Sequence, residues 1–458
     1  MKRDKTVGIL VNPVPFFLRI LCAPPISILR LPLLVLVLSS PSSPPAQGQK
    51  APGTAAESEL LTEAEEVLQE ISQIRGLEVK RPVRKGLKSQ AELRAFVLKK
   101  LEEEYTDQEI LNQSKALVKL GLLPRGARLK ELLVNLLTEQ IAGVYDPEEK
   151  IFYIADWMPE VLQKPIMAHE LTHALQDQYL DLPQFLKRTK DNDDEALART
   201  AVIEGEALAV MIDYLLKPQG LDLSTLTDLA SLMKSQISLL GGEFGMGDQI
   251  PEIITETLVF PYLYGVSFVQ TFRKSHPWAD FLKIYEDPPT SSEQILHPVK
   301  YFDARDDPVQ IRMEDFSGLL AGNWKEIDSN VLGEQGLSIL VKKFAGKEMA
   351  QLASEGWGGD RYKLLEEGTT GDLILLHFST WDAPKEAMEF FLAYRQVVEN
   401  KYTSERLLQS EKRRAYLWDT EEGAVYLEIR GRDVIFVEGA SEDLLEPLKK
   451  QLWNSQKR

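Results

Sequence analysis

The sequence is poor in cysteine, histidine and positive charge. It contains one cysteine, Cys22, and five histidines among 458 residues. A single cysteine excludes an intramolecular disulfide and a metal site built from several cysteines. Acidic residues outnumber basic ones by 70 to 53, which gives a formal net charge of −17. We therefore expect no nucleic-acid partner, because nucleic-acid binding depends on basic side chains that neutralise phosphates.

The first 48 residues differ in composition from the rest of the chain. Five basic residues and one acidic residue precede or flank the apolar run Leu31–Leu38, and Ser, Pro, Ala and Gly follow it. This order is typical of an export signal, so we expect residues 1–48 to be removed and the mature chain to be periplasmic or extracellular. Eight apolar residues are too few to cross a hydrocarbon layer of ~30 Å, so no stable membrane insertion is expected after cleavage. The longer, mostly apolar stretch Val7–Leu38 leaves an uncleaved anchor as the alternative.

Residue patterning predicts an α+β protein with three parts after the signal. Residues 49–130 are predicted to form a helical N-terminal segment, with a pro-segment as the alternative. Residues 131–320 are predicted to form a mainly helical domain with a small sheet, and residues 321–458 a smaller α+β sandwich. Residues 357–362 are predicted to form a tight turn that holds the domains together, with recognition of a ligand as the alternative.

The predicted elements follow from apolar periodicity, capping residues and breakers. The predicted strands are 77–83, 143–145, 151–154, 372–380, 414–418, 424–430 and 434–438. The predicted helices are 59–74, 90–104, 106–120, 130–140, 165–179, 195–216, 223–239, 262–274, 384–399 and 444–452. The pair 143–145 and 151–154 is expected to form a hairpin that leads directly into the helix 165–179.

The most informative motif is His169-Glu170-Leu171-Thr172-His173. Histidines four residues apart on a helix lie on one face, one turn apart, where both imidazoles can bind one zinc ion. The glutamate between them points away by about 100° and can accept a proton from a zinc-bound water. The motif therefore predicts Zn²⁺ as cofactor and Glu170 as the general base.

A catalytic zinc site needs a third protein ligand, and Glu204 is the best candidate. It belongs to an apolar stripe at i+3/i+4 spacing in the helix 195–216, whereas Glu206 shares a face with Arg199, Asp213 and Lys217. A carboxylate on a buried face must be paired or bound to metal. We therefore predict Glu204 as the third ligand, with a buried pair between Glu204 and an arginine as the alternative.

Other residues are candidates for secondary roles. His297 and the tyrosines Tyr262 and Tyr264 could donate to the oxyanion of amide hydrolysis. Of the two tyrosines we select Tyr264, together with His297. Asp177, one turn after His173, could accept a hydrogen bond from an imidazole N–H.

These residues resemble those of the gluzincin peptidases. The segment His169–Ala174, with Asp177 after it, resembles the metal helix of the thermolysin-like peptidases. Glu204-Gly205-x-Ala207 resembles the zinc-glutamate segment of the M1 aminopeptidases. Segments 145–147, 293–298 and 357–361 are similar to uncharacterised exported bacterial HExxH proteins. The resemblance implies a zincin-type domain in which His169, His173 and Glu204 bind zinc.

The sequence also departs from both named families. The interval from His173 to Glu204 is longer, and Leu208 stands where an acidic residue follows the zinc glutamate. The motif Gly-x-Met-Glu-Asn, which binds a substrate amino terminus, is absent from the sequence, which argues against an aminopeptidase.

The expected function is zinc-dependent hydrolysis of peptide bonds in a peptide or protein substrate. Two alternatives stay open: an exported zinc-binding interaction protein, and a non-peptide amide or ester hydrolase that uses the same residues.

Overall fold

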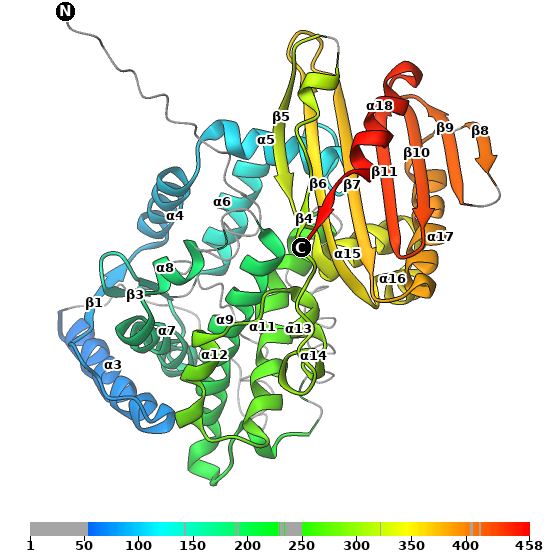
Figure 1. Cartoon of the computed structure of the whole chain (residues 1–458). Helices are drawn as coiled ribbons and strands as arrows, with labels where there is room; N and C mark the ends of the chain where they lie inside the picture. Colours follow the sequence, from blue (N-terminus) through cyan, green and yellow to red (C-terminus); the bar gives the residue numbers. More distant parts are fainter. Residues whose placement is uncertain are drawn as a thin grey trace, which may run out of the picture.

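The computed structural model describes residues 54–458 except 142, 188, 190–191, 228, 230–232, 234–249, 321, 404–405 and 412–413. The predicted signal and most of the predicted helix 223–239 lie outside these residues. The chain is α+β, with a helical part and a seven-stranded sheet (Figure 1). Among the described residues, no helix is both long and apolar enough to cross a membrane.

The helical part, called the helical body here, also contains a three-stranded sheet of order β1-β3-β2. Its strands are β1 (Arg84–Lys88), β2 (Gly143–Asp146) and β3 (Ile151–Ala155). Its α-helices are α3 (Thr54–Arg75), α4 (Gln90–Glu104), α5 (Asp107–Lys119), α6 (Leu129–Gln140), α7 (Glu160–Leu180), α8 (Leu182–Lys187), α9 (Asp193–Leu216), α11 (Glu252–Arg273), α12 (Leu282–Glu286), α13 (Ser292–Leu296) and α14 (Val299–Phe302).

Local signals predicted several of these helices well. Ser89 and Thr106 each cap a helix, and each forms a capping box with the glutamate three residues later, so α4 and α5 begin where expected. The hairpin is also confirmed, because β2 and β3 pair antiparallel and lead into α7. The predicted strand 77–83 is wrong. The strand instead begins at Arg84 and pairs in parallel with β3, a long-range contact that the local pattern did not reveal.

The second part, called the sheet domain here, has strand order β5-β6-β7-β11-β10-β9-β8 with antiparallel pairing throughout. Its strands are β5 (Trp324–Asn330), β6 (Trp357–Glu367), β7 (Leu373–Trp381), β8 (Arg406–Glu411), β9 (Ala415–Thr420), β10 (Gly423–Arg430) and β11 (Asp433–Ala440). Its helices are α15 (Gly333–Ala345), α16 (Lys347–Ser354), α17 (Pro384–Lys401) and α18 (Glu442–Trp453). A short pair, β4 (Ile311–Arg312) with β12 (Gln456–Lys457), joins the chain end to this domain.

Helices cover both faces of the large sheet. Because side chains alternate along each strand, one strand contributes to the hydrophobic core on each face. In β7, Ile374 and Leu376 belong to the core under α18, whereas Leu375 belongs to the core on the α17 side. The α17-side core is continuous with that of the helical body, from Ala64 onward. The two parts of the chain therefore share one hydrophobic core.

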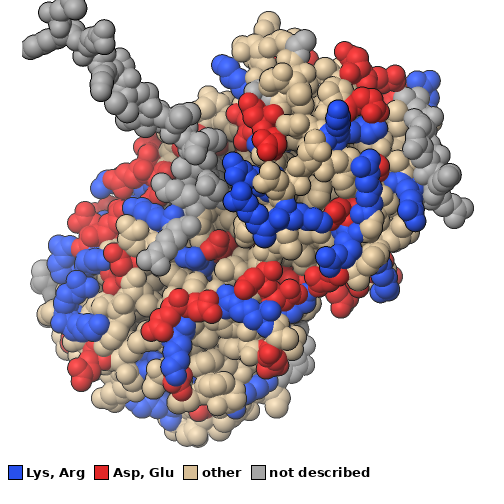
Figure 2. Space-filling view, in the orientation of Figure 1, with Lys and Arg blue, Asp and Glu red and all other residues tan. Residues whose placement is uncertain are grey.

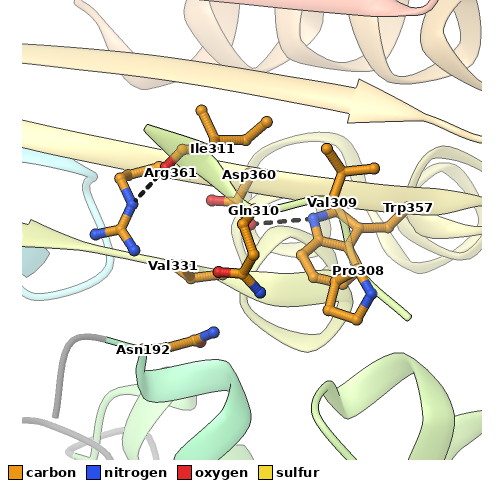
Figure 3. Close-up of a pocket in the computed structure, with 9 residues that line it drawn as sticks. All are labelled: Asn192, Pro308, Val309, Gln310, Ile311, Val331, Trp357, Asp360 and Arg361. Carbon is orange, nitrogen blue, oxygen red and sulfur yellow. Dashed lines mark hydrogen bonds between the residues drawn. The ribbon is translucent and has the colours of Figure 1, made fainter. Parts of the chain in front are cut away.

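Residues 357–362 form the start of β6, so the predicted tight turn is wrong. They still join the two parts of the protein, since they line a small hollow with Asn192 at the start of α9 and with the segment 308–311 (Figure 3). Trp357 Nε1 donates to Asp360, 3.0 Å away, and Arg361 Nε donates to the Ile311 carbonyl at 3.0 Å.

Over the face drawn in Figure 2, acidic and basic side chains are intermixed.

Candidate metal centre

The helix that carries the histidine pentad is longer than predicted. α7 begins at Glu160, so Pro165 lies inside it rather than at its start. Proline lacks an N–H, and the hydrogen bond to the carbonyl of Val161 is therefore missing there. Val161 is 66% exposed, so water can reach this turn. From Pro165 to Asp177 every residue of α7 is buried, which places the whole pentad in the interior.

Three ligand atoms meet at the predicted centre. The Nε2 atoms of His169 and His173 are 3.1 Å apart, and Glu204 Oε2 lies 3.1 Å from the first and 3.4 Å from the second. For a tetrahedral zinc ion with bonds of about 2.0–2.1 Å, neighbouring ligand atoms lie about 3.3 Å apart. The three predicted ligands are therefore brought together at spacings that fit zinc.

The helices α9 and α11 cross at glycines next to Glu204. A Cβ on Gly205 would lie 2.4 Å from the carbonyl carbon of Gly265, and a Cβ on Gly265 would lie 2.2 Å from the carbonyl oxygen of Ala201. Only glycine allows two helix backbones to approach so closely. The crossing therefore lies next to Glu204 in the sequence of α9.

The glutamate of the pentad is held by the hairpin. Glu170 is fully buried, and its Oε2 accepts a hydrogen bond of 3.0 Å from the backbone N–H of Tyr145 in β2. The Tyr145 hydroxyl donates to Asp177 Oδ2 at 2.9 Å. One residue of β2 thus contacts α7 at two points, two turns apart, and orients Glu170 next to the imidazoles.

The electrostatics of the cluster favour a positive charge at its centre. Burial by itself lowers the pKa of His173, but the carboxylates of Glu204 and Glu170 and the hydrogen bond with Gln176 together raise this pKa to about 9. Burial by itself raises the pKa of Glu204, but His173 and His169 together lower this pKa to about 2. Burial also lowers the pKa of His169. A buried carboxylate that faces two imidazole nitrogens is stabilised by a cation between them.

Two expectations about neighbouring acidic residues are wrong. Asp177 accepts from Tyr145 and from Lys150 Nζ at 2.6 Å, and the partner of the imidazole is Gln176, whose Oε1 lies 2.8 Å from His173 Nδ1. Glu206 does not lie on a solvated face of α9. It is fully buried, because α3, α7 and α11 surround α9 and leave it no polar side.

The structure does not bring the two selected oxyanion donors to the cluster. Tyr264 packs on Phe260 and lies near Glu256 and Lys342. Tyr262, two residues earlier and about 200° around the helix, lies against His169 with ring centroids 6.1 Å apart. Tyr262 is therefore the tyrosine beside the predicted ligands.

His297 belongs to a different contact. Its Nε2 lies 2.9 Å from Glu334 Oε1, and this hydrogen bond raises the pKa of His297. The adjoining Gly333 packs on Asp194, which lies about 15 Å along α9 from Glu204 at 1.5 Å per residue. The role predicted for His297 therefore finds no support at the metal centre.

A second carboxylate cluster is already neutralised by a side chain. Glu293, Asp306 and Asp382 could hold a cation by their spacing. Lys300 Nζ lies among them, at 2.6 Å from Glu293 and 2.8 Å from each aspartate. An ammonium group fills this site, which leaves the His169–His173–Glu204 cluster as the metal candidate among the described residues.

Several residues around the centre were missed from the sequence: Arg75, Tyr145, Gln176, Glu206 and Tyr285. Gln176 could have been found, since it lies three residues after His173 and so on the same helix face. No local pattern marks the others, because each reaches the centre through long-range packing.

One comparison with known proteins gives a match. A family model described as a domain of unknown function, DUF8575, matches residues 320–449, which include nearly all of the sheet domain. No curated protein and no solved structure matches the chain. The chain is thus similar in its sheet domain to a family without an assigned function, and the metal centre lies outside the matched residues.

Proposed function

We propose that this chain is a zinc-dependent hydrolase of peptide bonds. The observation that carries the proposal is the convergence of His169, His173 and Glu204 at 3.1–3.4 Å beside a buried glutamate. Within the described part of the chain, Glu204 forms ion pairs with these two histidines and with no lysine or arginine. The ligands are those of a catalytic zinc site, which has three protein ligands and an open position.

The roles of the other residues follow from their positions. Bound zinc would supply a Lewis acid that lowers the pKa of water to about 7 and polarises a carbonyl group. Glu170, oriented by the Tyr145 N–H, accepts the proton of the attacking water and passes it to the leaving amine. We assign Tyr262, in place of Tyr264 and His297, as the donor to the oxyanion. The substrate is a peptide or protein met outside the cytoplasm, if residues 1–48 act as the export signal that they resemble.

The decisive experiment compares Glu170→Gln with the wild type. We expect turnover of a mixed peptide library to fall by about 100-fold or more, because the general base is lost. Zinc content should stay the same, since Glu170 is not a ligand. Glu195→Gln is the matched control: Glu195 lies on α9, pairs with Arg199 at 2.6 Å and is outside the centre, so this variant should keep its turnover.

The outcomes separate this function from its alternatives. Cleavage by the wild type that a chelator abolishes and Glu170→Gln removes supports the peptidase. Zinc binding without cleavage of any amide or ester supports a zinc-binding interaction protein instead. Cleavage of esters or small amides without peptides supports the non-peptide hydrolase. A Glu170→Gln variant with full turnover contradicts the proposed mechanism.

A further inference from the structure

The last residue of α3 reaches into the interior behind the metal centre. Arg75 is fully buried, and its Nε forms an ion pair with Glu206 Oε1. Its Nη1 donates to the Trp278 carbonyl at 2.5 Å, and its guanidinium lies 5.0 Å from the Trp278 ring centroid. The N-terminal helix therefore contributes a charge to the core of the helical body.

Glu206 in turn holds Gln176. Glu206 Oε2 accepts from Gln176 Nε2 at 2.8 Å and also from the Tyr285 hydroxyl. Gln176 Nε2 donates to the Ile203 carbonyl as well, at 3.0 Å. A carboxylate and a carbonyl can only accept, so the amide nitrogen of Gln176 must face them.

The orientation of this amide decides the tautomer of His173. With Nε2 of Gln176 turned to Glu206 and Ile203, its Oε1 faces His173 Nδ1 at 2.8 Å. An amide oxygen only accepts, so Nδ1 must carry a proton. Neutral His173 then has its lone pair on Nε2, the atom that faces His169 and Glu204.

Stability alone does not account for this arrangement. A fully buried ion pair loses so much hydration that an apolar pair of similar volume is often as stable or more stable. Arg75 and Glu206 are both fully buried, with Tyr285 and Gln176 on the same carboxylate. What these groups do that apolar residues cannot do is orient one amide.

We propose that Arg75, Glu206 and Gln176 form a positioning chain that sets the tautomer of His173 and raises the affinity of the centre for zinc. This inference rests on the proposed function, because it concerns the same zinc site. It also makes α3 a permanent part of the centre rather than a removable pro-segment, since the chain of contacts begins at Arg75.

The test is zinc affinity of the full chain, measured without turnover by competition with a chelator of known affinity. Gln176→Met keeps the side-chain length and removes the hydrogen bonds of the amide to His173, Glu206 and Ile203, so zinc should bind about 10- to 100-fold more weakly. Gln270→Met is the matched control. Gln270 is a buried helical glutamine that donates to the Leu223 and Leu226 carbonyls, away from the cluster, so zinc affinity should not change.

Two further variants keep the test sharp. The exchange Gln176→Glu with Glu206→Gln keeps an acceptor for His173 Nδ1 and a donor between positions 176 and 206, so it should recover most of the lost affinity. Arg75→Met with Glu206→Met removes both buried charges together and should weaken zinc binding about 10-fold. This pair decides the same question if Gln176→Met does not fold.

The outcomes distinguish this inference from the proposed function. Wild-type zinc affinity in Gln176→Met, or in the Arg75–Glu206 pair of substitutions, overturns the positioning chain and leaves the proposed function standing. Weaker zinc binding in Gln176→Met and in the Arg75–Glu206 double variant, without peptide cleavage by the wild type, supports the positioning chain and contradicts the proposed peptidase function. A wild type that binds no zinc overturns both.

Discussion

Two clusters of acidic and basic groups in this protein share a geometry and differ in what lies inside. In the helical body, His169, His173 and Glu204 place three ligand atoms together, fully or almost fully buried. Near the sheet domain, Glu293 and two aspartates do the same around Lys300. One cluster contains a lysine, and the other consists of two imidazoles and one carboxylate.

The difference explains why only one of the clusters is a metal candidate. The Lys300 ammonium group donates short hydrogen bonds to the three carboxylates around it, so these carboxylates need no metal ion. Two imidazole nitrogens and a carboxylate oxygen converge on a common point, and Gln176 Oε1 lies 2.8 Å from His173 Nδ1, the ring nitrogen that faces away from that point. The spacing of possible ligand atoms alone would assign both clusters to metal, and the position of Lys300 distinguishes them.

The largest effect is expected from a direct comparison of the clusters. Glu204→Gln should weaken zinc binding by more than about 100-fold, because groups behind a ligand already contribute about 10- to 100-fold. Asp306→Asn, in the cluster with Lys300, should leave zinc binding unchanged. Zinc content after dialysis and chelator competition measure both. Equal zinc loss in the two variants would mean that the comparison is wrong.

The helix crossing next to Glu204 should be the most sensitive point for folding. Gly205→Ala places a Cβ against the Gly265 backbone, so we expect a loss of about 3 kcal/mol or more in the free energy of unfolding. Gly318→Ala is the control, since nothing lies within 4 Å of a Cβ there. Denaturant unfolding of both variants measures the effect. Similar stability of the two would show that α9 and α11 can separate without cost.

The buried carboxyl group of Asp328 should make the free energy of unfolding depend on pH. Burial raises the pKa of Asp328 in β5 to about 6, although the Tyr362 hydroxyl donates to it at 2.7 Å. Because the folded pKa lies above the ordinary aspartate value of 3.8, the contribution of Asp328 to stability is complete below about pH 4 and is lost as pH rises through about 6. The loss should be roughly 3 kcal/mol.

The measurement is unfolding of the wild type and of Asp328→Asn between pH 4 and 7. The asparagine cannot ionise and still accepts from Tyr362, so the difference in stability between the two proteins should grow with pH. A difference that is constant with pH would contradict the assignment.

The smallest effect is expected from removal of Lys300. Lys300→Met leaves three carboxylates without their partner, but Asp306 and Asp382 are about two-fifths exposed, so solvent screens part of the repulsion. We expect a loss of about 1–2 kcal/mol in unfolding free energy. Added calcium should restore part of it, because the remaining ligands are oxygens. No calcium response, with wild-type stability, would show that Lys300 does not neutralise the cluster.

Helices and strands could be predicted where their sequence signal lies within a few neighbouring residues, and not where they depend on pairing with a distant segment. The helices 90–104 and 106–120 were predicted because their signals are local: the structure shows a capping box at Ser89 and at Thr106, each within four residues. The strand at 84–88 was missed because its residues, Arg-Lys-Gly-Leu-Lys, carry no alternating pattern, and it forms only by pairing with β3. β5 was likewise not predicted, since its strand identity depends on pairing with β6.

At the candidate site, one prediction about a glutamate was right and another was wrong. Glu204 was selected correctly as a neighbour of the histidines, but the reason given for rejecting Glu206 was wrong. The charged residues of α9 do not form a solvated face, because the helix is buried on nearly all sides. Glu206 is buried too, and Arg75 rather than solvent satisfies its charge.

The sequence by itself determined that His169 and His173 share a helix face with Glu170 beside them, because helical periodicity is local. Only the tertiary structure decided that Glu204 meets them, that Tyr262 rather than Tyr264 lies alongside, and that Lys300 fills the other cluster. These relations join segments far apart in the chain. Their positions depend on how helices pack, above all on the close crossing of α9 and α11 at two glycines.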